Sequence, residues 1–353
     1  MAVLRIAVIG GDGIGPEVID QAIHAADAAT RKFDKAELQS NKLPWSTAYY
    51  KQHGQMMPDD GWETLRKHDA ILFGAVGDPT VPDTIPVHQL LLPMRRKFDQ
   101  YVNLRPAYLF AGVPCPLVGK KPGDIDMLVY RENTEGEYAP VGGNLYAGTE
   151  NEIAVQTGVF TRRGCDRILR AAFDAARKRP RKKLTSITKS NAQVFSMGLW
   201  DQVYLEVRKD YPDVQSSSLL VDAAAMDFVR KPESFDVVVA SNLFGDILTD
   251  LSAAVTGSIG LASSANVNPT RQFPSMFEPV HGSAPDITGK GIANPLAAVL
   301  SASLMLHHLG LEKSGAALRD AVAKVLAEGK VKTPDLGGMG TTTQLGDAVV
   351  AAI

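Results

Sequence analysis

Near the amino terminus, residues 4–16 read LRIAVIGGDGIGP, a largely apolar run followed by glycines and then a proline. The apolar run, which is rich in Ile and Val, predicts a buried β-strand. Pro16 suits the first turn of a helix, and the pattern extends that helix to about Lys32. A strand, a glycine turn and a helix in this order indicate an α/β fold.

The spacing of the glycines differs from that of the dinucleotide-binding fingerprint. Counting from Gly11, the glycines fall at i, i+2 and i+4, and position i+5 is Pro16; counting from Gly10, position i+2 is Asp12. The loop is therefore not a classical Rossmann loop. It remains open whether it is a structural turn or a helix start that meets a ligand.

The same alternation of strand and helix continues along the chain. Short apolar runs predict further strands at 69–74, 127–131, 184–188, 218–221 and 235–240. Asn294 and Pro295 predict a helix start, and Gly310 a helix stop about four turns later. Such runs imply a parallel sheet covered on both faces, and 353 residues suggest two domains. Ligands of these sheets gather at the carboxyl ends of strands, which here carry Gly74, Arg131, Lys189, Asp222 and Asn242.

Charge and composition restrict the partners. The chain has 37 basic and 39 acidic residues and a net charge of -2, so we expect no nucleic-acid and no membrane surface. The basic run at 177–183 is interpreted as a solvated connection. Cys115 and Cys165 have no metal or redox spacing, which favours a reduced compartment. The apolar stretch at 296–306 is too short to span a bilayer, and the amino terminus lacks the features of a signal peptide. We expect a soluble, cytoplasmic protein.

Two acidic residues stand out in residues 242–251, NLFGDILTDL. On a helix, Asp246 and Asp250 would lie about 40° apart, one turn above the other. A divalent cation with oxygen ligands would hold both carboxylates, whereas the alternative is a solvated helix start with Asp246 near the helix dipole. Asp222 could supply a third carboxylate or simply cap a helix. Lys189, at the end of a strand, is a candidate base, or else a solvated lysine.

Three arginines offer planar forks that match carboxylates. Arg95, Arg105 and Arg131 could together bind a small dicarboxylate, although each could equally form a surface ion pair. Tyr138, seven residues after Arg131, is a candidate proton donor, and the alternative is a half-buried core aromatic.

These motifs occur together and in one order, and the chain resembles the metal-dependent β-decarboxylating dehydrogenases: isocitrate, 3-isopropylmalate and D-malate/tartrate dehydrogenases. The resemblance runs from GDGIGPE at 11–17 to TPDLGG at 333–338. Its most specific parts are NLFGDILTD at 242–250 and FEPVHGSAPDI at 277–287, which is similar to the family's cofactor loop.

The resemblance implies a two-domain isopropylmalate-dehydrogenase-like α/β fold, with parallel or mixed sheets flanked by helices, not a classical Rossmann fold. Residues 1–100 and 260–353 would form a large cofactor-binding domain, and residues 101–259 a small domain carrying the dimer interface. The active unit would be a homodimer with its site shared across the interface; pairing of dimers into tetramers is left open.

The resemblance also assigns roles to residues. Mg²⁺ or Mn²⁺ would be bound by Asp246 and Asp250, with Asp222 from the neighbouring subunit. Lys189, also from that subunit, would take the proton of the substrate 2-hydroxyl, and Tyr138 would protonate the enol after loss of CO₂. The substrate carboxylates would be held by Arg95, Arg105 and Arg131. A requirement for a monovalent cation is left open.

The cofactor is predicted to be NAD. Family members that use NADP have a basic residue at the position of Asp286 and a tyrosine at that of Ile287. An aspartate accepts hydrogen bonds from ribose hydroxyls and repels a 2′-phosphate. The adenosine part would contact His281, Gly282 and Asn294, and the nicotinamide end would lie near Glu278 and the loop Gly74-Ala75-Val76-Gly77.

The substrate is predicted from the helix before Arg95. Leu91 and Leu92 disfavour the third carboxylate of isocitrate, because a buried carboxylate beside them would lack partners. Segments at 56–60, 98–106, 112–117 and 131–138 resemble the D-malate/tartrate branch, whereas Val87-His88-Gln89 departs from its usual Leu-Trp-Gly. We predict D-malate or tartrate as substrate, with 3-isopropylmalate as the alternative. Alternatives from other classes are a non-oxidative metal-dependent enzyme, such as a phosphate-transferring one, and a two-domain solute-binding protein.

Overall fold

The computed structural model describes residues 2–353. Contacts divide the chain into two compact units: unit 1 comprises Met1–Gln100, Arg105–Ile125 and Ala253–Ile353, and unit 2 comprises Tyr101–Leu104 and Asp126–Ser252. Residues 105–125 and 253–259 thus fall in unit 1, whereas the sequence suggested the small domain. Both segments make tertiary contacts with the rest of unit 1: Lys332 Nζ donates to the carbonyl of Gly112 at 3.2 Å, and Ser258 Oγ donates to Asp335 Oδ2 at 2.7 Å.

Unit 1 contains a mixed sheet with the strand order β2-β1-β3-β12-β11. Neighbouring strands are parallel except for the antiparallel pair β11–β12. The strands are β1 (Val3–Gly11), β2 (Glu37–Lys42), β3 (Ala70–Ala75), β11 (Ser263–Val267) and β12 (Ser275–Pro279), while β4 (Val102–Tyr108) is shared with unit 2. The helices are α1 (Gly15–Phe33), α2 (Thr47–His53), α3 (Gly61–Arg66), α4 (Thr84–Pro86), α5 (Leu92–Lys97), α10 (Leu296–His308), α11 (Glu312–Glu328) and α12 (Thr342–Ala352). Three short helical turns are η1 (Val87–Leu91), η4 (Ile259–Leu261) and η5 (Pro334–Leu336).

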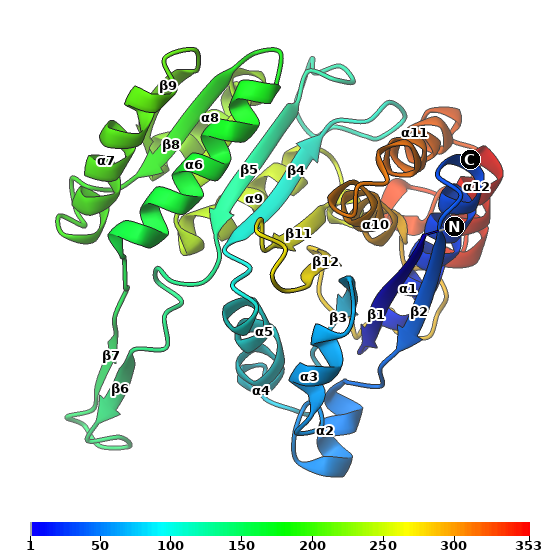
Figure 1. Ribbon diagram of the computed structural model, residues 1–353, viewed down its shortest axis with the longest axis horizontal. Coiled ribbons are helices and arrows are strands. Elements are labelled where there is room, and N and C mark those ends of the chain that lie inside the picture. Colours follow the sequence, from blue (N-terminus) through cyan, green and yellow to red (C-terminus); the bar gives the residue numbers. More distant parts are fainter. Residues whose placement is uncertain (1) are drawn as a thin grey trace. The chain divides into compact units, whose positions relative to one another are not determined.

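Both faces of the unit 1 sheet are covered, as near-continuous apolar strands require. Helices α1, α10, α11 and α12 pack together, and α1 and α10 contact the strands (Figure 1). Alternate residues point to the other face, where Ile9, Ile71 and Phe73 join Met94 and Phe98 in a buried cluster. This packing fixes α5, which carries Arg95, against the sheet.

Unit 2 contains a parallel sheet with the order β5-β10-β8-β9. Its strands are β5 (Asp126–Glu132), β8 (Lys183–Thr188), β9 (Gln215–Leu220) and β10 (Val237–Ala240). Its helices are α6 (Arg162–Lys178), α7 (Ser196–Val207), α8 (Val221–Arg230) and α9 (Asn242–Val255, whose last residues belong to unit 1), with short turns η2 (Arg208–Asp210) and η3 (Pro232–Ser234). Helix α6 packs on β5, β8 and β10, which orders the strand ends that carry the candidate site.

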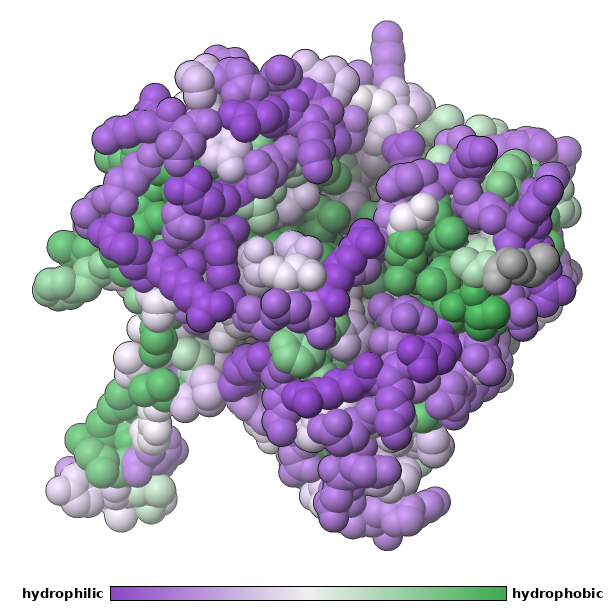
Figure 2. All heavy atoms as spheres, viewed as in Figure 1, coloured by the Kyte–Doolittle hydropathy of each residue, from purple (hydrophilic) through white to green (hydrophobic). Residues whose placement is uncertain are grey.

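Unit 2 also carries a two-stranded antiparallel hairpin of β6 (Gly142–Leu145) and β7 (Ile153–Gln156). Leu145 pairs with Ile153, and Gly143 with Val155, so the apolar residues of the two strands share one face. Leu145, Ile153 and Val155 are 58%, 47% and 51% exposed. Figure 2 shows the hairpin as an arm with hydrophobic residues at its surface.

The predicted elements are present, with ends displaced by at most three residues. The predicted strand at 235–240 begins at Val237, and the predicted strand at 218–221 ends at Leu220, where α8 begins. Helix α10 begins at Leu296, and Asn294 Oδ1 accepts from the amide of Leu296 at 3.0 Å. Within residues 2–353, no helix is both long and apolar enough to cross a membrane.

Candidate functional site

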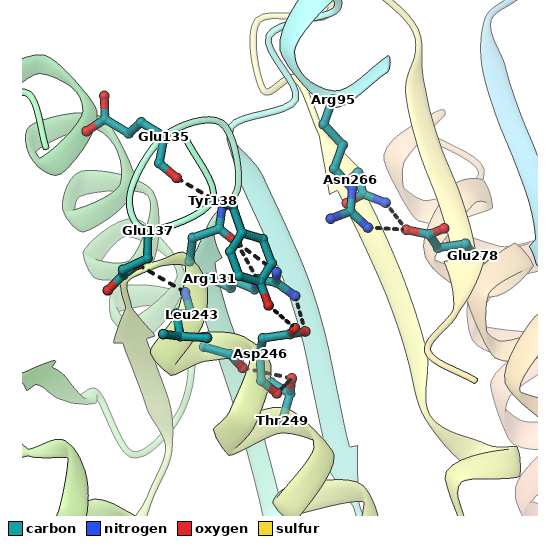
Figure 3. Close-up of polar contacts among 12 residues, drawn as sticks. Arg95, Arg131, Glu135, Glu137, Tyr138, Leu243, Asp246, Thr249, Asn266 and Glu278 are labelled. Carbon is teal, nitrogen blue, oxygen red and sulfur yellow. Dashed lines mark hydrogen bonds and ion pairs between the residues drawn. The ribbon is translucent and has the colours of Figure 1, made fainter. Parts of the chain in front are cut away.

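Asp246 lies at the centre of a polar cluster in unit 2 (Figure 3). Arg131, at the end of β5, contacts Asp246 Oδ1 through Nη1, and the Tyr138 hydroxyl donates to Oδ2 at 2.7 Å. Arg131 is 1% exposed, and its Nε and Nη2 donate to Asn242 Oδ1 at 3.0 and 2.7 Å. The structure therefore brings three predicted site residues, Arg131, Tyr138 and Asp246, into contact.

The glycines of this region allow that close approach. A Cβ on Gly245 would lie 2.7 Å from the Cβ and Cγ atoms of Arg131. Gly136 has a φ of +78°, a conformation that favours glycine, and a Cβ there would lie 3.1 Å from Asn242 Cβ. The NLFGD motif thus brings α9 against β5, and Glu137 accepts from the amide of Leu243 at 3.1 Å.

The donor set fits a hard divalent cation. Asp246 and Asp250 lie one turn apart on α9, with Asp246 half-buried and Asp250 exposed. Within residues 2–353 the structure contains no group of three His, Cys, Asp or Glu side chains that could hold a metal ion. One chain thus supplies two carboxylates on α9, and any third carboxylate ligand must come from elsewhere.

Lys189 and Asp222 form a pair of their own. Lys189 follows β8 and Asp222 lies in the first turn of α8, and Lys189 Nζ donates to Asp222 Oδ1 at 2.7 Å. This hydrogen bond lowers the pKa of Asp222 below its ordinary value. The side chains are 28% and 62% exposed, so both remain open to another molecule.

In unit 1, Arg95, which is predicted to bind substrate, contacts Glu278, which is predicted to lie near the cofactor. Arg95 Nη2 donates to Glu278 Oε1 at 2.9 Å, and Asn266 Nδ2 donates to the same oxygen at 2.7 Å (Figure 3). Arg95 is 8% exposed, and its Nε is buried without a hydrogen-bond partner. A buried donor without a partner is costly, and an anionic ligand would satisfy it. Arg105 is equally buried.

The predicted specificity residues lie at a change in helix type. Leu91 ends η1, a π-helical turn, and Leu92 begins α5. Leu92 is buried, and Leu91 packs against the core cluster of unit 1. Single π-turns often mark functional sites, and this one covers Val87-His88-Gln89, where the sequence departs from the D-malate/tartrate pattern.

In unit 1 the glycine loop contacts two loops that are predicted to bind the cofactor. Asp12 accepts from the amides of Thr47 and Gly77, at 3.0 and 3.1 Å. The amide of Ile14 donates to the carbonyl of Ser283 at 2.9 Å, and a Cβ on Gly13 would lie 2.0 Å from that oxygen. The glycine loop therefore positions two other segments. One is the loop Gly74–Gly77, which includes the end of β3, and the other is the loop that contains Gly282. Sequence reasoning did not single out Asp12, because a lone loop aspartate carries no pattern.

The cofactor residues differ in their availability. His281 Nε2 is buried without a partner, and burial lowers the pKa of this histidine, so a ligand that donates to the neutral ring fits here. Asp286 is exposed and forms no hydrogen bond or ion pair within the described chain, as an acceptor for ribose hydroxyls requires. Asn294, by contrast, is engaged with Asp335 at 2.9 Å and with the start of α10. We therefore interpret Asn294 as a residue that positions the helix.

The fold, with glycine loops at the carboxyl ends of the strands and with Arg131 in contact with Asp246 on α9, is that of an α/β dehydrogenase outside the classical Rossmann group. Residues 5–349 match the family model described as isocitrate/isopropylmalate dehydrogenase. The chain belongs to the isocitrate/isopropylmalate dehydrogenase family.

Individual relatives agree with this assignment. D-malate dehydrogenase [decarboxylating] of Escherichia coli is 53% identical, over 100% of this chain and 99% of the relative. Tartrate dehydrogenase/decarboxylase of Pseudomonas putida is also 53% identical, over 98% and 96%. The crystal structure of isocitrate dehydrogenase from Methylococcus capsulatus superposes with a TM-score of 0.89 at 34% identity, over 100% and 99%. Family and relatives identify an oxidative decarboxylating dehydrogenase of this family.

Proposed function

We propose that this chain oxidises and decarboxylates a small 2-hydroxy dicarboxylic acid, with NAD and Mg²⁺ or Mn²⁺ as cofactors and with D-malate or tartrate as substrate. The observation that carries the proposal is the contact of Arg131 and Tyr138 with Asp246 on α9. It supports the proposal because the candidate carboxylate-binding arginine and the candidate proton donor both contact one candidate metal ligand.

The residues divide the chemistry among them. Asp246, Asp250 and the partner subunit's Asp222 would hold the cation, which supplies a Lewis acid when bound. Arg131 binds a substrate carboxylate, as do Arg95 and Arg105, which lie in unit 1. NAD, when bound, supplies the hydride acceptor.

Two side chains move protons. The amine of Lys189 takes the proton of the 2-hydroxyl, and the Tyr138 hydroxyl returns one to C3 after the carboxylate departs as CO₂. Tyr138 Oη is 2.7 Å from Asp246, so its donor is oriented before substrate arrives.

The cofactor preference follows from Asp286. Its exposed carboxylate can accept from the ribose hydroxyls of NAD and would repel a 2′-phosphate. We also propose that Glu278 and the loop Gly74–Gly77 lie near the nicotinamide, and that His281 and Gly282 lie near the adenosine.

The active unit is a homodimer in this proposal. The apolar hairpin face of Leu145, Ile153 and Val155 is exposed in one chain, and an isolated two-stranded hairpin is marginally stable in water. A second copy of the chain would cover it. The exposed Lys189–Asp222 pair and the two-carboxylate set on α9 are then complementary parts of one shared site.

The proposal includes a cytoplasmic location. The thiols of Cys115 and Cys165 form no disulfide, which is in keeping with a reducing compartment.

One assay tests the proposal. Purified protein is mixed with NAD and Mn²⁺ and, separately, with D-malate, tartrate, 3-isopropylmalate and isocitrate, and NADH absorbance is followed. We expect the highest kcat/KM with D-malate or tartrate. A clear preference for 3-isopropylmalate, which the apolar Leu91 and Leu92 would accommodate, contradicts the choice of substrate. The absence of NADH with all four contradicts the reaction.

A further inference from the structure

A cavity in unit 1 has a lining unlike that of the candidate site. Its volume is about 320 Å³, and its lining includes Arg5, Arg66, His68, Asp69, Arg271 and His308. None of these residues has a role in the proposed reaction.

The cavity lies at the amino-terminal ends of three strands. Arg5 is in the first half of β1, Asp69 precedes β3, and Pro274 precedes β12. Ala70 pairs with both Ile6 and Ser275, so these parallel strands start side by side. The loops predicted for the cofactor follow the carboxyl ends of the same strands. A ligand of this cavity is therefore separate from substrate and cofactor.

Positive charge exceeds negative charge in the cavity. Three guanidinium groups and one carboxylate, that of Asp69, line the cavity. A second carboxylate, that of Glu63, lies 3.5 Å from Arg66, so the positive groups still outnumber the negative ones. Asp69 already accepts from the amide of Arg5 at 2.7 Å, and its Oδ2 is 3.9 Å from Arg5 Nε. Arg271 forms no ion pair or hydrogen bond through its side chain within residues 2–353.

The basic groups are held on a rigid base. Arg66 lies over the ring of Phe273 at 5.3 Å, and Phe273 stacks on the buried Phe98 at 5.9 Å. Arg271 has a φ of +56°, rare for a residue with a side chain, in a turn closed by its amide to the carbonyl of Asn268 at 3.0 Å. Such a backbone persists where the surroundings hold it, so the turn fixes the point from which the Arg271 side chain leaves the backbone.

Two histidines also line the cavity. Both ring nitrogens of His68 have partners, since Nδ1 lies 2.9 Å from the carbonyl of Thr64 and Nε2 lies 3.3 Å from Asn41 Nδ2. Burial, together with the charge of Arg271, lowers the pKa of His308 to about 4. The arginines therefore give the cavity its positive charge, and the pKa of His308 responds to the charge of Arg271.

We propose that this cavity binds a small phosphorylated anion, with Arg66 and Arg271 as its main ligands. Arginine forks match phosphoryl oxygens, and the negative charge of the anion offsets the excess of one positive charge. At about 30 Å³ per water, the cavity holds roughly ten waters. That volume suits phosphate or a small phosphate monoester, not a dinucleotide.

Calorimetric titration of the intact, NAD-saturated protein at constant ionic strength tests the proposal. The probes are inorganic phosphate, glycerol phosphate and, as a carboxylate comparison, malonate. We expect saturable binding of both phosphates and weaker binding of malonate. No saturable phosphate binding, or malonate binding as tight as phosphate, overturns the proposal.

Variants locate the site. Arg271→Gln and Arg66→Gln should each weaken phosphate binding at least tenfold, and Arg271→Lys, which keeps the charge but loses the fork, should weaken it less. The matched control is Arg208→Gln, because Arg208 also lies over an aromatic ring, that of Tyr204, at 5.9 Å. An equal loss in the control, or no loss in the Arg271 variants, contradicts the assignment.

A spectroscopic measurement does not depend on the variants. Phosphate should raise the pKa of His308, followed by NMR of its ring, because the anion offsets the charge of Arg271. Chloride at equal ionic strength should not. An unchanged His308 titration at saturating phosphate would place any binding elsewhere and overturn the proposal.

Discussion

The Tyr138 hydroxyl donates a 2.7 Å hydrogen bond to Asp246, while the ring of the same tyrosine lies 5.3 Å from the guanidinium of Arg131. Both the hydroxyl and the ring of Tyr138 are therefore held in place, next to the proposed metal ligand. This fixed position is consistent with the proposed role of Tyr138 as a proton donor.

Replacing Tyr138 by Phe should lower kcat by ~10²–10⁴-fold, the usual contribution of a general acid, and should leave NAD binding unchanged. Steady-state NADH formation and a separate NAD titration measure both. Tyr146→Phe, on the hairpin where Tyr146 is 67% exposed, is the control. A decrease of less than about threefold for Tyr138→Phe would remove it from the mechanism.

Gly245→Ala should destabilise the protein by about 1–3 kcal/mol, because the new methyl group overpacks the site. It would lie 2.7 Å from Arg131. Thermal unfolding should show the loss, along with reduced activity. Gly198→Ala, in the open on α7, should be neutral or stabilising by up to about 1 kcal/mol. Equal melting temperatures for the two variants would contradict the close approach of α9 to β5.

Asp286→Lys combined with Ile287→Tyr should raise the ratio of kcat/KM for NADP to that for NAD at least tenfold. The lysine attracts the 2′-phosphate that the aspartate repels. Asp320→Lys, an exposed position on α11, makes the same change of charge and should leave the ratio unchanged. If the double variant keeps the original ratio, Asp286 does not discriminate between the cofactors.

The lowered pKa of His308 predicts that the free energy of unfolding depends on pH. Its pKa is lowered to about 4 in the folded chain, from the ordinary value of 6.5. As the pH falls below 6.5, the unfolded chain binds a proton that the folded chain does not, so stability decreases until about pH 4. Between pH 7 and pH 5 this amounts to at most about 2 kcal/mol. Urea unfolding at both values should show a smaller decrease for His308→Gln; an identical decrease would show that His308 is not held neutral.

Val155→Asp should disrupt the homodimer, since it places a charge on the exposed apolar face of the hairpin. Light scattering after gel filtration should show a shift toward monomer, and activity should decrease with it. Val118→Asp, at a position 100% exposed in unit 1, is the control and should remain dimeric. A dimeric Val155→Asp would exclude the hairpin as the interface.

Much of the fold was predictable, because neighbouring residues decide local structure. The strand and glycine turn at 4–15, the Pro16 helix and the Gly310 stop appear as expected. The position of Asp246 and Asp250 on one helix also follows from spacing alone. The hairpin of β6 and β7 and the assignment of 105–125 to unit 1 did not follow, since neither segment carries a strong apolar period.

By itself, then, the sequence determined the α/β alternation, the family motifs and the residue types of the site, since these depend on periodicity and on the order of side chains along the chain. Only the tertiary structure decided which of those side chains meet. Arg131 reaches Asp246 across 115 residues, Arg95 reaches Glu278 across 183, and the cavity of Arg66 and Arg271 has no sequence pattern. Such contacts depend on how whole strands and helices pack, which local spacing does not encode.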